Sequence, residues 1–337
     1  MAQPHLMRGP VRPCAGETSS GCILGADRAG ALRRISEAIG RFVAERFLAD
    51  VATGSTVGRH LALETLIRGK LVAVKPNDTW ASVEDTTAVT QPDTLRAVLR
   101  YLKRFGPREL VVSGGAGAAQ TEEVFRLAGL LDVVAQEGAS FFDHNRPPFT
   151  TVALEYKPEA DVQGAQPSVM VNSRVLAYET LIALNQLKLH QTATVTLALK
   201  NIAMSYPAAD HYGHPRLTQH HRHWFFDDLH SFIAAMAKRF PIHLAITVGH
   251  PAMIGTGPLG GYAVETGLVI ASTDPLAADV VGAKLLGFQV QAVRHLWEAE
   301  RLGIGETDLE QMAFPAMSLQ DAIGAFTTAA YGKPLSF

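Results

Sequence analysis

Apolar and polar residues alternate along this chain in two patterns. Short apolar runs rich in β-branched residues end at Gly, Pro or Asn, which is typical of buried strands. Other stretches repeat apolar residues every three or four positions, which predicts amphipathic helices. The predicted strands span 71–75, 110–113, 152–156, 169–171, 243–248 and 267–271. The predicted helices occupy 31–47 or begin close to Pro92, Thr121, Asp227 or Asp228, and Pro275.

The order of these elements predicts the fold class. Strands followed by helices are typical of an α/β fold with a mostly parallel sheet flanked by helices. The stretch 180–201 mixes β-branched residues with helix formers and predicts neither state clearly. A chain of 337 residues is long enough for two cores. We therefore expect a flexible arm over 1–24 and two α/β subdomains, over 25–160 and 161–337, with a cleft between them.

Composition and charge narrow the class of protein. Apolar residues make up 47% of the chain and charged residues 18%, which is typical of a globular protein. The formal net charge of -2 gives no sign of a basic surface for nucleic acid or anionic lipid. No apolar run approaches the roughly 20 residues of a membrane span, and the first residues lack the apolar core of a signal peptide. We expect a cytoplasmic protein without nucleic-acid or membrane partners.

The two cysteines, Cys14 and Cys22, restrict the cofactors. They predict free thiols in a reducing compartment, with a disulfide as the alternative. Two cysteines cannot supply the four thiolates of a zinc or iron–sulfur site. We therefore expect no iron–sulfur domain within this chain.

Polar residues gather where the predicted strands end. They are Lys75 with Asn77, Ser113 with Gly114–Gly117, His250 with Gly255 and Gly257, and Ser272 to Asp274. In open α/β sheets, ligands bind at the carboxyl ends of parallel strands. If all these strands are parallel, the loops converge on one ligand site.

Three of these features also have a purely structural interpretation. The Gly114–Gly117 turn is either a tight strand-to-helix turn or a backbone cradle for an anion. Lys75 at the end of a buried strand either extends its ammonium to water or faces a ligand beside Asn77. Asp274, directly before Pro275, is either a helix cap or a ligand contact.

A second cluster of candidates lies in the stretch 188–201. Lys188, His190, Lys200 and Asn201 occur there with several threonines. Lysine ammonium groups could bind a carboxylate or phosphate, and a histidine or a lysine of lowered pKa could transfer a proton near neutral pH. The alternative is a polar, exposed strand face.

Two further features could bind a metal. His220, His221 and His223 form a cluster whose alternative is a solvated loop. Asp279 lies inside an apolar helix, where a carboxylate needs a partner. It either faces the ligand site, where it could bind a divalent ion, or pairs with a lysine.

Five segments occur in an order that resembles one known family. They are KLVAVKPNDTW, TLRAVLRYLKRFGPRELVVSGGAG, QLKLHQTATVTLALKN, PAMIGTGP and VIASTDPLAADVVGAKLLGF. Over about residues 69–287 the chain is similar to the uncharacterised family called "domain of unknown function 362". The motif positions that the resemblance carries over are Lys75, Asn77, Lys188, His190, Lys200, Asn201, Gly255, Gly257, Asp274 and Asp279. Many relatives have acids where this chain has Val248 and Ile254, so any role of those acids is absent or filled differently here.

These observations lead to one expected function and two alternatives. We expect an enzyme that binds a small carboxylate or phosphate through Lys75, Lys188 and Lys200. His190 or one lysine would transfer a proton, and Asp274 or Asp279 would orient a lysine or coordinate a divalent ion. Some relatives carry a fused ferredoxin-type domain, so the resemblance also implies a redox accessory protein with an iron–sulfur partner. The third alternative is a small-molecule binding protein without catalysis.

Overall fold

The fold is known from a computed structural model that describes residues 63–155, 168–214, 228–314 and 317–335. Several expectations fall outside these ranges. They are the arm over 1–24, the helix over 31–47, Cys14, Cys22, the boundary between 160 and 161, and the cluster His220, His221 and His223.

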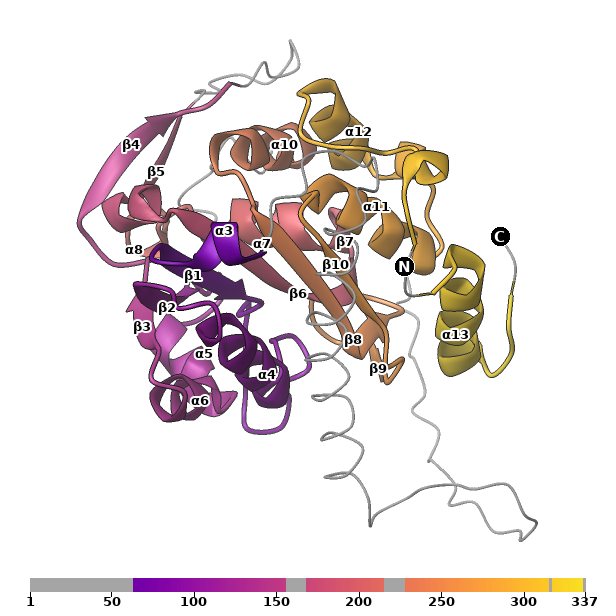
Figure 1. The fold of residues 1–337 in the computed structure, drawn as a ribbon, viewed down its shortest axis with the longest axis horizontal. Helices are drawn as coiled ribbons and strands as arrows, with labels where there is room; N and C mark the ends of the chain where they lie inside the picture. Colours follow the sequence, from indigo (N-terminus) through magenta and orange to yellow (C-terminus); the bar gives the residue numbers. More distant parts are fainter. Residues whose placement is uncertain (1–62, 156–167, 215–227, 315–316, 336–337) are drawn as a thin grey trace, which may run out of the picture.

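The main sheet has eight strands in the order β10-β8-β6-β1-β2-β3, with β7 paired to β6 and β9 to β8 (Figure 1). The strands are β1 (Leu71–Pro76), β2 (Glu109–Gly114), β3 (Ser140–Asp143), β6 (Thr180–His190), β7 (Thr194–Thr196), β8 (Leu244–Ile254), β9 (Tyr262–Val264) and β10 (Val269–Ser272). The pairs β1–β2, β1–β6, β2–β3 and β6–β8 are parallel. The predicted α/β class with a mostly parallel sheet is confirmed.

A two-stranded antiparallel sheet stands apart from the main one (Figure 1). It consists of β4 (Phe149–Ala153) and β5 (Ser168–Asn172). The main sheet takes β1–β3 from the first expected subdomain and β6–β10 from the second. Both halves of the chain therefore contribute to one sheet.

Helices cover both faces of the main sheet (Figure 1). They are α3 (Leu63–Ile67), α4 (Pro92–Lys103), α5 (Thr121–Leu127), α6 (Leu130–Gln136), α7 (Ala198–Ser205), α8 (Ala209–Tyr212), α10 (Leu229–Arg239), α11 (Pro275–Leu285), α12 (Arg294–Arg301) and α13 (Leu319–Tyr331). Apolar side chains of α3–α6 form one core cluster, and those of α7 and α10–α13 form the other. None of the helices in the described ranges is both long and apolar enough to span a bilayer.

Strand β1 shows how the sequence supplies both cores. Side chains alternate between the two faces of a strand. Val72 and Val74 belong to the cluster under α4–α6, and Ala73 belongs to the cluster under α7. Lys75 continues the row of Ala73, so its side chain extends toward α7. This alternation places a lysine inside the protein at the end of a central strand.

Candidate functional site

Lys75 is held in a buried ion pair at the carboxyl end of β1. Its side chain is fully buried, and its Nζ lies 2.7 Å from Oδ1 of Asp78, itself 4% exposed. The ammonium also donates to the Pro76 carbonyl and to Oδ1 of Asn201 on α7, at 3.3 Å. Burying an ammonium is costly unless its donors are satisfied. Lys75 therefore acts as a fixed positive charge inside the protein, and its ammonium does not extend to water.

Asparagine amides join the neighbouring strands around Lys75. Asn201 Nδ2 donates to the Lys75 carbonyl at 3.1 Å and to Oδ1 of Asn185 on β6 at 2.8 Å. Asn77 Oδ1 accepts from the Gln186 backbone N–H at 2.7 Å. Asn201 and Asn77 were both expected to bind ligand, but in this structure they hold β1, β6 and α7 together.

Lys188 and Lys200 are buried close to Lys75. Lys188 Nζ donates to the Ala88 carbonyl at 2.9 Å. Burial and then the positive charge of Lys200 lower the pKa of Lys188 to about 7, which the Asp78 charge opposes. Burial lowers the pKa of Lys200 to about 7 as well. Lys200 is 7% exposed, and its ammonium has no hydrogen-bond acceptor among the described residues.

His190 ends β6 beside these lysines. Its Nδ1 accepts backbone N–H groups of Thr192 and Ala193 at 3.1 and 3.2 Å. Burial and then the charges of Lys200 and Lys188 lower the pKa of His190 to about 2. His190 is therefore neutral at physiological pH, with its proton on Nε2 because Nδ1 accepts. The pKa values of the two lysines fit the expected proton transfer near neutral pH, and the pKa of His190 does not.

The loop after β8 packs directly against the end of β6. The Gly257 carbonyl accepts from the Gln191 N–H at 2.9 Å. A Cβ on Gly257 would lie 2.0 Å from the Leu189 carbonyl oxygen, so only glycine permits this approach. Gly255 has a φ of +83° and faces the Tyr262 ring. The fold thus brings the Gly255–Pro258 loop next to His190, two regions far apart in sequence.

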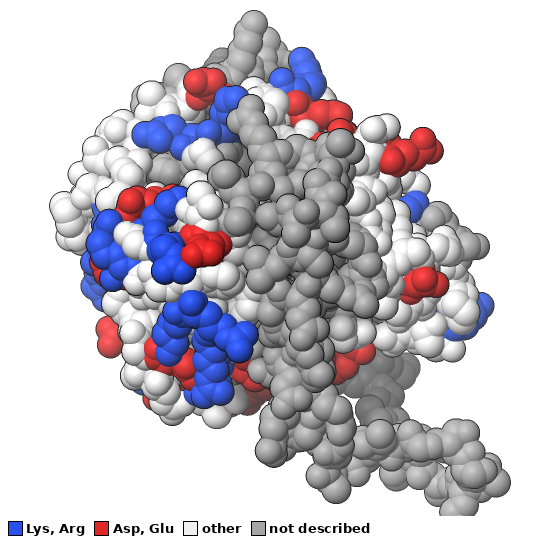
Figure 2. All heavy atoms as spheres, in the orientation of Figure 1, with Lys and Arg blue, Asp and Glu red and all other residues white. Residues whose placement is uncertain are grey.

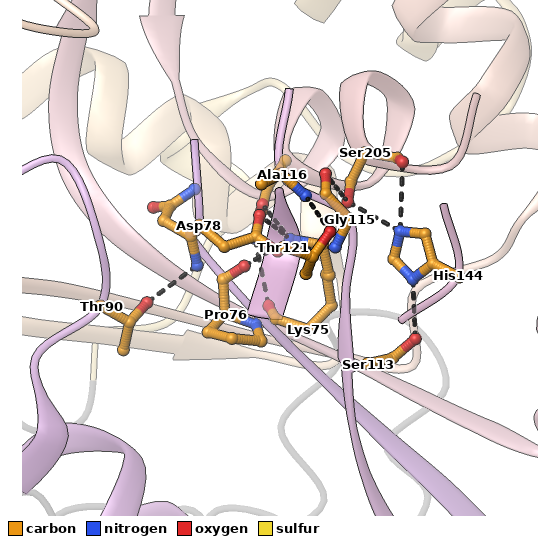
Figure 3. A network of polar contacts seen from close by, with 12 residues as sticks. Lys75, Pro76, Asp78, Thr90, Ser113, Gly115, Ala116, Thr121, His144 and Ser205 are labelled. Atoms are coloured by element: carbon orange, nitrogen blue, oxygen red, sulfur yellow. Dashed lines mark hydrogen bonds and ion pairs between the residues drawn. The ribbon is translucent and has the colours of Figure 1, made fainter. Parts of the chain in front are cut away.

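The Gly114–Gly117 turn binds protein groups. The Gly115 N–H donates to Asp78 Oδ2 at 2.7 Å, and the Ala116 N–H donates to Thr121 Oγ1 at 3.2 Å. The carboxylate of Asp78 therefore connects this turn to Lys75 (Figure 3). This arrangement matches the tight-turn interpretation of the sequence.

A buried histidine extends the same network. His144 Nδ1 lies 2.8 Å from Ser113 Oγ, and His144 Nε2 lies 2.9 Å from Ser205 Oγ. The Ser205 hydroxyl in turn donates to the Gly115 carbonyl at 3.0 Å. Figure 3 shows these groups converging on the end of β2, close to Lys75 and Asp78. The network ties β2, β3 and α7 to the lysine cluster.

The two aspartates of α11 serve backbone amides. Asp279 is fully buried, and its two oxygens accept from Ala198 and Leu199 N–H at 2.7 and 2.9 Å. It thereby caps α7, the helix of Lys200. Burial raises the pKa of Asp279 to about 7, against these hydrogen bonds. Asp274 caps α11 through the Ala277 N–H and also accepts from the Glu306 N–H.

The condition for convergence of the strand-end loops, that all the strands are parallel, is not met by the strand before Asp274. Strand β10 is antiparallel to β8, so the residues that follow it do not leave the carboxyl end of a parallel strand. In the described ranges no group of three or more His, Cys, Asp or Glu is placed to hold a metal ion.

His250 forms a separate ionic cluster on β8. Its Nδ1 lies 2.6 Å from Glu265 Oε2, and its Nε2 lies 3.0 Å from Asp93 Oδ2. Burial opposes protonation, but the two carboxylates outweigh it and raise the pKa of His250 from 6.5 to about 9. The imidazolium therefore joins α4, β8 and the residues after β9.

We expect this cluster to make the free energy of unfolding decrease at alkaline pH. Because the folded pKa of His250 is raised, its contribution is complete below pH 6.5 and is lost as pH rises through about 9. Glu265 is well exposed, so solvent screening limits the loss to about 1–2 kcal/mol. Urea unfolding of the wild type between these pH values should show the decline, and His250→Gln should flatten it. An equal decline in the variant would assign the effect to other groups.

The lysines of the site differ from those on the surface. Figure 2 shows Lys and Arg interspersed with Asp and Glu on the visible face. On α4, for example, Arg96, Arg100 and Lys103 surround Glu137. Lys75, Lys188 and Lys200 are instead buried, with Asp78 as the carboxylate that contacts one of them. The positive charge of the candidate site is internal.

Sequence reasoning brought forward the lysines, His190, Asn201 and the Gly257 loop, but it missed other members of the network. Asp78 follows Lys75 by three residues, and that spacing was a usable signal. His144, Asn185 and Ser205 come from separate segments, and nothing in the local sequence distinguishes them.

Comparison with known proteins adds two findings. The model of the family described as Domain of unknown function (DUF362) matches residues 72–284, the range that carries Lys75, Lys188, Lys200 and Asp279. The thylakoid-associated protein sll1697 of Synechocystis sp. (strain ATCC 27184 / PCC 6803 / Kazusa) is 24% identical over 258 residues, which cover 73% of this chain and 72% of that protein.

Proposed function

From the premise that this chain belongs to the Domain of unknown function (DUF362) family, we propose that it is an enzyme for a small anionic substrate. Its carboxylate or phosphate binds at Lys188 and Lys200, and one of these amines transfers a proton. The observation that carries the proposal is the pair of buried lysines whose pKa values lie near 7, of which Lys200 contacts no acceptor in the ranges that the structure describes. An amine that titrates near neutral pH can both accept and donate a proton there.

The surrounding groups have defined roles in this proposal. Lys75 forms an ion pair with Asp78 and holds Asn201, the neighbour of Lys200, in place. His190 offers an Nε2–H donor, because its Nδ1 is occupied by backbone amides. Asp279, expected from the sequence to bind a metal, supports the site by capping the helix that carries Lys200.

Binding of an anion should draw protons onto the lysines. At pH 8 an amine of pKa about 7 is mostly neutral, and a bound anion favours its charged form. Phosphate titrations by calorimetry, in two buffers of different ionisation enthalpy, should therefore show proton uptake at pH 8 and less at pH 6. Affinity should fall as pH rises from 6 to 8.

The matched variants are Lys200→Gln and the surface control Lys333→Gln. Loss of a charge-assisted hydrogen bond is expected to weaken phosphate binding about tenfold or more in Lys200→Gln. Lys333 is an exposed lysine outside the site, so its variant should bind like the wild type. Equal binding by all three proteins, or no binding at all, would refute the proposal.

Proton transfer itself is tested by isotope exchange. We expect the wild type to catalyse the exchange of a carbon-bound hydrogen of a carboxylic acid for deuterium from D2O. NMR measures this exchange for each acid of a panel of small acids. Binding without exchange or turnover would identify a non-catalytic binding protein. No observation among the described residues favours the redox accessory alternative. We also propose a cytoplasmic location, on the sequence arguments alone.

A further inference from the structure

Two histidines outside the expected site contact each other next to α7. His230 lies on α10 and His295 on α12, and their Nδ1 atoms are 3.1 Å apart. His230 Nδ1 also accepts the backbone N–H of His295 at 3.3 Å. Their rings are nearly parallel, with an interplanar angle of 23°. His295 is fully buried and lies beyond the residues 72–284 that the family model matches.

The contacts define which ring nitrogens carry protons. Because His230 Nδ1 accepts a backbone N–H, it is unprotonated, and the proton between the two rings belongs to His295 Nδ1. Burial and then the neighbouring His230 and Lys200 hold the pKa of His295 well below its usual value, so the ring is neutral. A neutral ring with a proton on Nδ1 has a bare lone pair on Nε2. That atom is therefore an acceptor.

The His295 Nε2 acceptor is buried and has no hydrogen-bond donor among the described residues. His230, the ring partner of His295, lies on α10, which packs against α7, the helix of Lys200. The charge of Lys200 also contributes to the lowered pKa of His295. A buried acceptor without a donor carries the full cost of its lost hydration. Such groups are rare in native proteins and need an explanation.

Three groups, on Lys200, His190 and His295, are together complementary to one kind of ligand. Within the described part of the chain, no hydrogen-bond acceptor contacts the Lys200 ammonium and no donor contacts His295 Nε2, while His190 carries an Nε2–H. We propose that the site binds an anion that carries an O–H group of its own: the charge contacts Lys200, and the O–H donates to His295 Nε2. This inference rests on the proposed anion site and states which anions that site prefers.

Monohydrogen phosphate and 2-hydroxycarboxylates share this chemistry. Sulfate has the shape of phosphate but no proton at neutral pH, and acetate lacks the hydroxyl of glycolate. Either proton-free anion would set an oxygen lone pair against that of His295. Phosphate is compared with sulfate, and glycolate with acetate. These two comparisons show whether the preferred ligand is a phosphate or a hydroxy acid.

The test measures the four dissociation constants by calorimetry on the full chain. We expect at least one proton-bearing anion to bind about tenfold more tightly than its proton-free partner, the worth of one good hydrogen bond. His295→Asn keeps a donor near Nδ1 for His230 but removes the Nε2 acceptor. It should abolish the preference, because phosphate or glycolate loses its acceptor and sulfate or acetate no longer meets an opposing lone pair.

His295→Gln is the companion variant, because its amide oxygen reaches the Nε2 position and should restore part of the preference. Thermal unfolding checks that both variants fold. If both lose their fold, the 15N shift of His295 Nε2 in the wild type decides: it should move on adding phosphate or glycolate and stay unchanged with sulfate or acetate. Anions that bind without preference, or a preference that survives in His295→Asn, would overturn the selectivity while leaving the anion site intact. Absence of any binding would overturn both.

Discussion

Replacement of Asp78 by alanine is expected to lower the free energy of unfolding by about 3–5 kcal/mol. The substitution leaves the fully buried Lys75 ammonium without its carboxylate, 2.7 Å away in the wild type. It also leaves the Gly115 N–H without its acceptor. Since domains are typically stable by about 5–15 kcal/mol, this is a large fraction of the total. Chemical denaturation at neutral pH measures the loss.

The double variant Asp78→Ala with Lys75→Met is the control for this interpretation. Removal of both charges removes the uncompensated one, so the double variant should be more stable than Asp78→Ala alone. A double variant as unstable as the sum of the two single variants would show that the charges do not interact. The Asp78 charge also raises the pKa of Lys188, so Asp78→Ala should depress that pKa further.

Replacement of Gly115 by alanine is the second substitution with a large expected effect. A Cβ at this position would lie 1.9 Å from His144 Nε2 and 2.7 Å from Ser205 Oγ. Both side chains are buried and hydrogen-bonded to each other, so neither can move without breaking the network. Overpacking of this kind is expected to cost about 3 kcal/mol. Denaturant unfolding and the chemical shift of the His144 ring should both change.

Gly324→Ala is the matched control. Gly324 lies within α13, and nothing is within 4 Å of the position where its Cβ would be. Alanine is the better helix former, so this variant should be about 0.5–1 kcal/mol more stable. If Gly115→Ala were as stable as the wild type, the close packing of His144 on the turn would be wrong.

The candidate site was only partly predictable, for a reason that particular residues show. Lys75, Lys188 and His190 lie at strand ends, where the carboxyl-end rule for α/β sheets applies. For Lys200 and Asn201 the sequence predicted neither helix nor strand, and the structure places both on α7, where they are buried. His295 and His144 gave no local signal, because their importance comes from partners at distant positions.

The pattern of buried strands by itself determined β1, β2 and β5. Proline and aspartate residues determined where three of the helices begin. Pro92 and Pro275 start α4 and α11, and Asp228 precedes α10. These signals are local: they depend on backbone dihedrals, on capping and on the alternation of side chains.

Only the tertiary structure decided the assignment of 180–201 and the direction of β10. Residues 180–190 became a strand because β1 and β8 pair with them on both sides. β10 runs antiparallel to β8, so Asp274 does not follow the carboxyl end of a parallel strand. The lowered pKa values of Lys188 and Lys200 likewise arise from burial, which pairing and packing create and a linear sequence does not contain. The sequence alone thus singled out the lysines and His190, and the packing of distant segments decided which residues meet them.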